Sequence, residues 1–312
     1  QNGRPSAQNP WYNQVSPNPV YAWGYDFDHE SAATKIFVDR VNRYWLTEYK
    51  VDGFRFDFTK GFTNTPGDGS AYDAARIAIL QRMADRMWEI DTTVYVILEH
   101  FADNTEEKVL AEYSQGMMLW GNSNRTYNEA TMGYHTGGKS DFSWGYYGTR
   151  GWQAPHLVTY MESHDEERLM FKNVSYGASC GSYQVKDTTI ALQRQQMVGA
   201  FFFSYPGPKM IWQFGELGYD YSIDYLGRLG EKPIRWDYFN QTDRKRLFKT
   251  WAALLTLRNQ NEVFTSAQSV DLWLNDVNGR KRIRLIHPSM NVTIVGNFGV
   301  TDQAIDPSFV HP

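Results

Sequence analysis

The sequence lacks the features that mark several classes of protein. Its 312 residues include one cysteine, Cys180, so no disulfide can form within the chain. No apolar run approaches the ~20 residues that a membrane-spanning helix needs, and the longest apolar cluster, at 201–203, ends at Pro206. The formal net charge is −4, whereas nucleic-acid binding rests on clustered lysine and arginine. The composition therefore predicts neither a membrane span nor a nucleic-acid partner.

The beginning of the chain also lacks a secretory signal. Its first ten residues have neither a basic start nor an apolar stretch. Residues 1–30 are rich in Pro, Asn and aromatics, with turn signals such as Asn9-Pro10, and we expect a loop there. The single cysteine fits a reducing compartment, but it equally fits the secreted bacterial enzymes that have no disulfides.

Aromatic residues are abundant, at 16% of the chain, with 11 Trp and 20 Tyr. For any single Trp, the simplest interpretation is a place in a large core. As a set, the excess favours a ligand with flat apolar faces and many hydroxyls. Sugars are such ligands, because the C–H face of a pyranose stacks on an indole.

Helical and strand patterns alternate through most of the chain. Ser31 can cap a helix with an apolar stripe at Phe37, Val41, Tyr44 and Trp45, followed by a short alternating strand at 51–58. A second helix places Ile77, Leu80, Ala84, Met87 and Trp88 on one face. The run 94–98 is continuously apolar, which is typical of a strand buried in a parallel sheet. Further strands are expected at 116–120, 157–161 and 209–213, and further helices near 105–113, 187–203 and 242–259.

This order predicts an α/β fold with a parallel sheet and right-handed crossovers. The pattern changes near residue 268, where the alternating segments 270–274 and 282–287 flank the turn Asn278-Gly279 and a third such segment spans 291–298. We therefore predict three regions: a loop over 1–30, an α/β region over 31–266 and an antiparallel β region over 267–312; the family resemblance described below implies that the second is a partial barrel and the third the start of a β domain.

Three acidic residues follow predicted parallel strands: Asp57, Glu99 and Asp165. Catalytic groups collect at the carboxyl ends of strands in α/β barrels. Each acid follows apolar residues, so burial could shift its pKa and separate an acid from a nucleophile. Each also has a structural interpretation. Asp57 could pair with Arg55, Glu99 could cap the next helix, and Asp165 could belong to a solvated acidic run.

Taken together, the segments around these acids are specific. Gly53-Phe54-Arg55-Phe56-Asp57-Phe58-Thr59-Lys60, Val96-Ile97-Leu98-Glu99 and Glu162-Ser163-His164-Asp165 resemble, in order, three sequence blocks of the α-amylase family, glycoside hydrolase family 13. Tyr25-Asp26-Phe27-Asp28 resembles a shorter block, and the segments 213–218 and 233–237 resemble the stretch after the last barrel strand. The resemblance covers nearly the whole chain and is greatest to amylases of gut Bacteroidetes. It implies a (β/α)8 TIM barrel.

The resemblance implies catalytic roles for the three acids. Asp57 would be the nucleophile that forms a covalent glycosyl-enzyme, and Glu99 the general acid and then the base. Asp165 would bind sugar hydroxyls and favour a distorted, oxocarbenium-like transition state. The scheme requires the carboxyl groups of Asp57 and Glu99 to lie about 5–5.5 Å apart, since about 6.5 Å or more would indicate inversion.

The resemblance and the composition also suggest substrate-binding residues. Arg55 would keep the nucleophile ionised, His164 would bond to hydroxyls near the cleaved bond, and Lys60 would reach a sugar on the leaving-group side. Trp23 and Tyr25 are candidates to line the cleft, because Trp23 lies in a Pro/Gly loop where burial is less natural. For Tyr25, Trp120 and Trp144, core packing is the favoured interpretation.

The sequence departs from the family pattern at its beginning. No segment before Tyr25 resembles the family block at the end of the third strand, so the resemblance implies that about three barrel strands are missing and that the barrel is incomplete. We expect such a chain to self-associate or to bind a complementing N-terminal fragment, because unpaired strand edges and an uncovered core favour association. Ca²⁺ is a candidate ligand through Asp26 and the Gly61 carbonyl, although calcium takes six or more oxygens; the chemistry itself requires no cofactor.

The predicted function is a retaining hydrolase of α-1,4-glucosidic bonds in starch or maltooligosaccharides, located outside the cell or at the surface of a bacterium. A binding protein or impaired fragment that holds α-glucan without turnover is the alternative. A third class is a barrel enzyme with a metal and a carboxylate base. Such an enzyme needs His, Asp or Glu ligands clustered at strand ends. Among the histidines, only His100 and His164 follow predicted strands, so the sequence disfavours this class.

Overall fold

A computed structural model describes residues 3–309 of the chain. The predicted loop over 1–30 and the predicted β domain over 267–312 each include terminal residues, 1–2 and 310–312, that lie outside the described part. Two compact units share the chain. The first comprises residues 1–120 and 150–158, and the second comprises 121–149 and 159–312.

A five-stranded sheet contains the predicted parallel strands. Its strand order is β1-β2-β3-β4-β7, and the registers of β1 with β2, β2 with β3 and β4 with β7 are parallel. The strands are β1 Gly53–Phe56, β2 Tyr95–Leu98, β3 Met118–Asn122, β4 Leu157–Tyr160 and β7 Lys209–Met210. Sequential strands are neighbours with helical segments between them, as in part of a (β/α) barrel. The predicted fold class, an incomplete barrel followed by a small antiparallel β domain, is confirmed.

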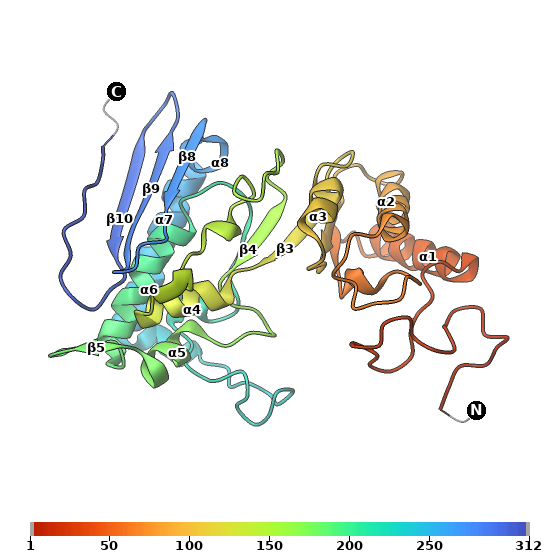
Figure 1. Ribbon diagram of the computed structural model, residues 1–312, viewed down its shortest axis with the longest axis horizontal. Helices are drawn as coiled ribbons and strands as arrows, with labels where there is room; N and C mark the ends of the chain where they lie inside the picture. Colours follow the sequence, from red (N-terminus) through yellow and green to blue (C-terminus); the bar gives the residue numbers. More distant parts are fainter. Residues whose placement is uncertain (1–2, 310–312) are drawn as a thin grey trace. The chain divides into compact units, whose positions relative to one another are not determined.

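The first unit holds the helices α1 Ala32–Glu48, α2 Ala74–Trp88 and α3 Asn104–Ala111 (Figure 1), and each begins after a capping residue. Ser31, Asp73 and Asp103 each accept a hydrogen bond from a backbone N–H of the first turn, which satisfies donors that have no partner within the helix. A 3₁₀ turn, η1 Thr59–Gly61, follows β1 directly.

The apolar stripe of α1 lies at the surface. Phe37, Tyr44 and Trp45 are 50%, 52% and 42% exposed, whereas the buried residues of the helix are Thr34, Asn42 and Leu46. The pattern correctly predicts a helix, which packs against α2 in this unit, but the apolar stripe is not its buried side. An apolar face of this extent on a described surface favours association.

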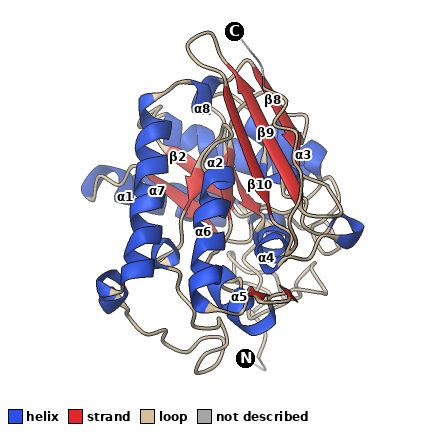
Figure 2. Ribbon diagram, turned by 90° about the vertical axis from the view of Figure 1, so that its left-hand side faces the viewer, coloured by secondary structure: helices blue, strands red, loops and turns tan. Residues whose placement is uncertain are grey.

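The second unit places a small antiparallel sheet against two long helices (Figure 2). The sheet has the order β10-β9-β8, with β8 Ser269–Trp273, β9 Arg280–Ile286 and β10 Val292–Asn297. Its inner residues share one core with α6 Thr188–Phe202 and α7 Thr242–Gln260; core members include Phe201, Trp251, Ile283 and Leu285. The predicted boundary near residue 266 stays a prediction.

The remaining elements of the second unit are short. They are α4 Asn124–Met132, α5 Leu169–Tyr176, α8 Val263–Ser266, the hairpin strands β5 Ser179–Cys180 and β6 Tyr183–Gln184, and the 3₁₀ turns η2 Thr136–Gly138, η3 Ser143–Gly145, η4 Gly215–Leu217 and η5 Trp236–Asn240. Cys180, in the β5–β6 hairpin, is exposed. None of the helices among residues 3–309 has the length and apolar character to cross a membrane.

Candidate active site

Strand register brings Asp57 and Glu99 together. In the parallel pair β1–β2, Phe56 lies opposite Leu98. The next residues of the two strands are Asp57 and Glu99, and the ladder continues there because the Glu99 N–H donates to the Phe56 carbonyl at 3.0 Å. Neighbouring strands lie about 4.8 Å apart, and residues opposite one another share a face of the sheet. Two carboxyl groups therefore meet at the carboxyl end of the sheet.

Glycine permits this close strand approach. A Cβ on Gly53 would lie 2.3 Å from the Tyr95 carbonyl oxygen, well inside van der Waals contact. A side chain at this position would push β1 away from β2. Glycine at position 53 therefore keeps β1 close to β2, and this short distance between the strands brings Asp57 close to Glu99.

Arg55 joins the two carboxylates. Its Nη1 lies 2.7 Å from Asp57 Oδ1, and its Nη2 lies 2.7 Å from Glu99 Oε2. Arg55 and Asp57 are two residues apart on one strand, so their side chains point to the same face. The guanidinium also lies over the Trp120 ring, 5.2 Å from its centroid. One rigid, planar cation therefore fixes both acids at once.

The two acids differ in environment. The Asp57 side chain is 77% exposed and that of Glu99 is 15% exposed. Burial, followed by a hydrogen bond with Asp57, raises the pKa of Glu99 to about 7, against the opposing effects of the Phe58 N–H and Arg55. A carboxyl group with this pKa is half protonated near neutral pH, which suits a proton donor.

The aromatic candidates differ in exposure and in their contacts. The Trp23 and Tyr25 rings are 77% and 60% exposed. The Trp23 ring contacts Tyr21 and Phe58, with centroids 5.3 and 6.1 Å away, and Phe58 directly follows Asp57 in the chain. Lys60 is buried, with its ammonium 4.7 Å from the Tyr21 ring centroid. Trp120 is buried, as expected, whereas Trp144 is half-exposed.

His164 and Asp165 belong to the second unit and form a pair there. His164 Nε2 lies 3.0 Å from Asp165 Oδ2, and both side chains are half-exposed. Arg228 donates to the Asp165 carbonyl. Nearby in sequence, Glu162 is buried and accepts a hydrogen bond from the Leu169 N–H at 2.6 Å, at the start of α5. Burial raises the pKa of Glu162 to about 7, against the effect of Arg168.

The predicted calcium ligands have other partners. The Asp26 carboxylate accepts hydrogen bonds from Asn13 Nδ2 at 2.7 Å and Ser16 Oγ at 3.2 Å, and the Gly61 carbonyl accepts one from the Thr63 N–H. A Ca²⁺ ion at Asp26 would have to replace these donors, so calcium binding stays a prediction. Over residues 3–309, no group of three or more His, Cys, Asp and Glu side chains could hold a metal ion.

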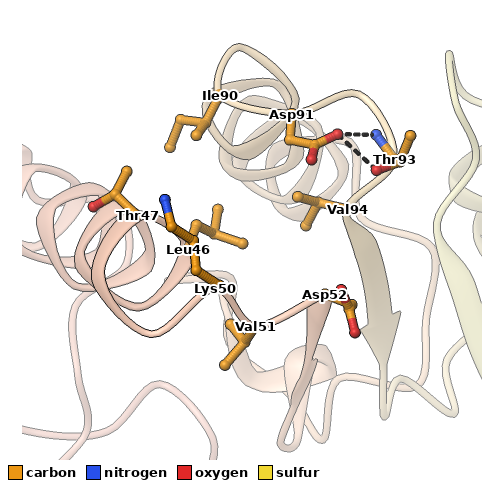
Figure 3. Close-up of a pocket in the computed structure, with 9 residues that line it drawn as sticks. All are labelled: Leu46, Thr47, Lys50, Val51, Asp52, Ile90, Asp91, Thr93 and Val94. Atoms are coloured by element: carbon orange, nitrogen blue, oxygen red, sulfur yellow. Dashed lines mark hydrogen bonds between the residues drawn. The ribbon is translucent and has the colours of Figure 1, made fainter.

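A pocket lies at the opposite ends of the same strands (Figure 3). Leu46, Lys50 and Asp52 line it from the end of α1 and the approach to β1, and Asp91 and Val94 line it from the loop before β2. Since active sites of α/β barrels form at the carboxyl ends of the strands, we place the candidate site at Asp57 and Glu99 rather than in this pocket.

A buried polar network behind the acids is absent from the sequence-based prediction. It links Thr59, His100, Glu106 and Arg76, each at most 1% exposed. The sequence identifies His100 only as a histidine that follows a predicted strand, directly after Glu99. Its hydrogen-bond partners are distant in the chain, so the sequence gives no signal for the rest of the network.

Comparisons with known proteins come from structure. No protein-family model and no curated protein sequence matches the chain. Its fold is similar to that of an Anoxybacillus α-amylase, with a TM-score of 0.63, 15% identity, and coverage of 94% of this chain and 60% of that one. A pullulanase from an Anoxybacillus species, solved with maltotetraose, gives a TM-score of 0.65 and 17% identity over 88% of this chain and 42% of that one.

A third similar structure is the cyclic α-maltosyl-(1→6)-maltose hydrolase of Arthrobacter globiformis. Its TM-score is 0.64 at 15% identity, with coverage of 95% of this chain and 62% of that one. The chain therefore spans between about two fifths and three fifths of the length of these three proteins. At such low identity, the likeness shows a shared fold.

Proposed function

We propose that this chain is part of a retaining glycoside hydrolase of the α-amylase family that cleaves α-1,4-glucosidic bonds of starch or maltooligosaccharides. The observation that carries the proposal is the contact of Asp57, Arg55 and Glu99 at adjacent strand ends. Most glycoside hydrolases use two carboxyl groups, one as the proton donor and the other as the nucleophile or base. The shared fold with an α-amylase and a pullulanase supports the choice of α-glucans.

The proposed reaction has two displacements. Asp57 attacks the anomeric carbon, and the C–O bond to the leaving sugar breaks while Glu99 gives its proton to the departing oxygen. The carboxylate of Glu99 then takes a proton from water, whose oxygen attacks the same carbon and releases Asp57. Both acids end in their starting protonation states, so the cycle needs no external oxidant, reductant or cofactor.

The spacing of the acids supports retention over inversion. Inverting enzymes hold their carboxyl groups about 6.5–9.5 Å apart to leave room for water, and retaining enzymes hold them about 5–5.5 Å apart. Asp57 and Glu99 are neighbours in strand register and hydrogen-bond to one another. A direct contact is shorter than both ranges and lies nearer to the retaining one, so it supports attack by Asp57, which requires the two carboxyl groups to separate to about 5–5.5 Å around the substrate.

Other residues would act on the substrate. We assign to Arg55 the task of keeping Asp57 ionised, because its guanidinium lies 2.7 Å from that carboxylate. The exposed Trp23 and Tyr25 rings offer stacking faces for sugars. The Lys60 ammonium contacts the ring of Tyr21 in this structure. To bind a sugar, as the resemblance implies, it would have to move away from that ring. Asp165 and His164 keep the hydroxyl-binding roles implied by the sequence resemblance.

Release of reducing sugar from starch tests the proposal. The intact chain should release reducing ends, and Glu99→Gln should lower kcat by about 100-fold or more, since a positioned general acid contributes roughly 10²–10⁴-fold. Glu89→Gln is the matched control, because Glu89 is an exposed surface glutamate. Product released with the α-anomeric configuration would support retention, and β-anomeric product would contradict it.

The alternative proposal is an α-glucan-binding chain without turnover. The chain covers 60% of the Anoxybacillus α-amylase, so the residues that complete a substrate site could lie outside it. Binding of maltooligosaccharides by the unmutated chain with no reducing-sugar release would favour this alternative. A bacterial extracellular or cell-surface location and a relationship to Bacteroidetes amylases stay proposals from the sequence resemblance.

A further inference from the structure

A chain of buried hydrogen bonds joins the loops that carry the two acids. Thr59 lies two residues after Asp57, and its N–H donates to the Glu99 carbonyl at 2.8 Å. Its Oγ1 lies 3.0 Å from that carbonyl and 2.9 Å from His100 Nδ1. The turn after β1 is therefore attached to the two residues that follow β2.

The same chain continues to the helices behind the sheet. His100 Nε2 lies 2.9 Å from Glu106 Oε1, in the first turn of α3. Arg76 of α2 donates to both oxygens of Glu106, each at 2.7 Å, and to the Lys60 carbonyl at 2.7 Å. Arg76 thus returns to the turn that contains Thr59, and the network closes on itself.

The count of protons fixes how these groups share hydrogens. Burial lowers the pKa of His100, against the effect of its bond to Glu106, so the imidazole is neutral and carries one N–H. Glu106 is an ionised acceptor: burial raises its pKa, but bonds from His100 and Arg76 together bring it below the ordinary value. Nε2 therefore carries the hydrogen, and Nδ1 accepts the hydroxyl hydrogen of Thr59. The Glu99 carbonyl accepts its hydrogen bond from the backbone N–H of Thr59.

The members bond to one another and to nearby backbone groups: Arg76 also donates to the Lys60 and Ala71 carbonyls, and Glu106 also accepts from the Asp73 N–H. Arg76, His100, Glu106 and Thr59 are at most 1% exposed, so water cannot replace a lost partner. An unsatisfied buried polar group is costly, which makes such a network rigid when complete. Catalytic groups need support of this kind, because small errors in their separation lower the rate steeply.

We propose that Thr59 and His100 are positioning residues, which set the distance between Asp57 and Glu99 by tying the loop after β1 to the loop after β2 on the Glu106–Arg76 ion pair. They touch neither substrate nor reacting atoms. The inference rests on the proposed hydrolase function for its kinetic consequence. Its structural part, the contact between the two acids, can be measured without activity.

The test compares three substitutions at buried threonines. Thr59→Val removes the hydroxyl with little change of shape, and Thr59→Ser keeps it. Thr34→Val makes the same chemical change at a fully buried threonine of α1, whose hydroxyl bonds to the Trp11 carbonyl instead. We expect Thr59→Val to lower kcat by about tenfold or more with KM changed less than about twofold, because misplaced catalytic groups affect the chemical step. Thr59→Ser and Thr34→Val should keep the wild-type kcat.

The second readout is the pKa of Glu99, measured by NMR of ¹³C-labelled glutamate over a range of pH. The signal that is missing from the spectrum of Glu99→Gln identifies Glu99. Loosening the contact with Asp57 should move the pKa of Glu99 from about 7 toward its ordinary value in Thr59→Val only. If Thr59→Val does not fold, His100→Asn replaces it, because the amide can still accept from Thr59 but cannot reach Glu106, and the same shift is expected.

The outcomes separate the two proposals. A wild-type chain that releases no reducing sugar but shows the shift of Glu99 in Thr59→Val contradicts the hydrolase proposal and supports positioning. If the Thr59→Val variant has the activity of the wild type and an unchanged pKa of Glu99, the positioning proposal is overturned. The same holds for His100→Asn where that variant is used instead. A loss of activity in Thr34→Val equal to that in Thr59→Val would also overturn it.

Discussion

Arg55 and Glu99 meet across two neighbouring strands, with Nη2 of the guanidinium 2.7 Å from Oε2 of the carboxylate. The other arm of the same guanidinium contacts Asp57. The arginine therefore acts on both acids in the same direction, because a nearby cation favours the ionised form of a carboxyl group. Burial acts on Glu99 in the opposite direction and prevails, since its pKa is raised to about 7.

The pH dependence of activity should follow Glu99. Its protonated form is the proton donor, so kcat/KM should fall as the pH rises through about 7. This fall is the alkaline limb of the pH profile. Well below pH 7, Glu99 is protonated and its titration does not limit the rate. Initial rates of reducing-sugar release between pH 4.5 and 9 would measure the limb. A limb that remains in place in a mutant lacking the Glu99 carboxyl would contradict this assignment.

Substitution of Arg55 should move the alkaline limb upward. Arg55→Gln removes the cation that lowers the pKa of Glu99, so the limb should appear above pH 7. The nucleophile would also lose its partner, and we expect kcat/KM to fall by about tenfold or more, as for other lost charge-assisted contacts of 1.5–3 kcal/mol. Arg86→Gln, at an exposed arginine paired with Glu89, is the control. A limb that moves to lower pH would contradict the role given to Arg55.

Glu162 should make stability depend on pH. Its folded-state pKa, about 7, lies above the ordinary value of 4.5, so the folded state binds the proton more tightly than the unfolded state. This contribution is complete below about pH 4.5 and is lost as the pH rises through 7. Glu162→Gln should therefore melt at a higher temperature than wild type at pH 8, with a smaller difference at pH 5. The effect is at most a few kcal/mol, since one pKa unit corresponds to about 1.4 kcal/mol.

Calorimetric melts at both pH values measure this difference, with Glu89→Gln as an exposed control. The side-chain amide introduced by Glu162→Gln can still accept the bond from the Leu169 N–H. Equal stabilisation at pH 5 and pH 8 would mean that the gain comes from something other than ionisation of this carboxyl group.

The exposed face of α1 should drive self-association or binding of a complementing fragment. Phe37, Tyr44 and Trp45 form part of an exposed apolar surface that also includes Val41. Phe37→Glu should reduce association, because burying a carboxylate in an apolar contact is unfavourable. Leu257→Glu makes the same change at an exposed apolar residue of α7. Sedimentation velocity over a concentration series measures the outcome, and a wild-type monomer with a cooperative melt counts against the prediction.

Calcium should bind through Asp26 if the sequence resemblance extends to that ligand. Added Ca²⁺ should then raise the melting temperature of wild type and have no such effect on Asp26→Asn, because calcium prefers charged oxygen ligands. Mg²⁺ at the same concentration serves as the control ion. Absence of any heat of binding at millimolar Ca²⁺ would remove calcium from the proposal.

The acid pair could be predicted from the sequence because its signal is local. Asp57 and Glu99 directly follow two apolar strands, and the parallel register of those strands places their last residues, Phe56 and Leu98, opposite one another. The helix starts at Ser31 and Asp73 are similarly local, since each capping side chain bonds to its own first turn. The short helices α4 and α5 escaped prediction, because neither shows a long apolar period.

The network behind the acids could not be predicted in this way. Arg76 and Glu106 are 30 residues apart, and Thr59 and His100 are 41 apart. Such partners are chosen by packing between elements rather than by neighbours in the chain. The exposed stripe of α1 illustrates the same limit, because periodicity predicts an apolar face and does not say what covers it.

The β5–β6 hairpin gives the chain a natural attachment point for a fluorophore. Cys180 is the single thiol of the sequence and is exposed, so a maleimide dye would modify one place in every molecule without prior mutagenesis. Depolarisation through energy transfer between identical dyes would then report the formation of complexes between copies of the chain. The unaltered polypeptide can thus be examined for assembly at nanomolar concentrations.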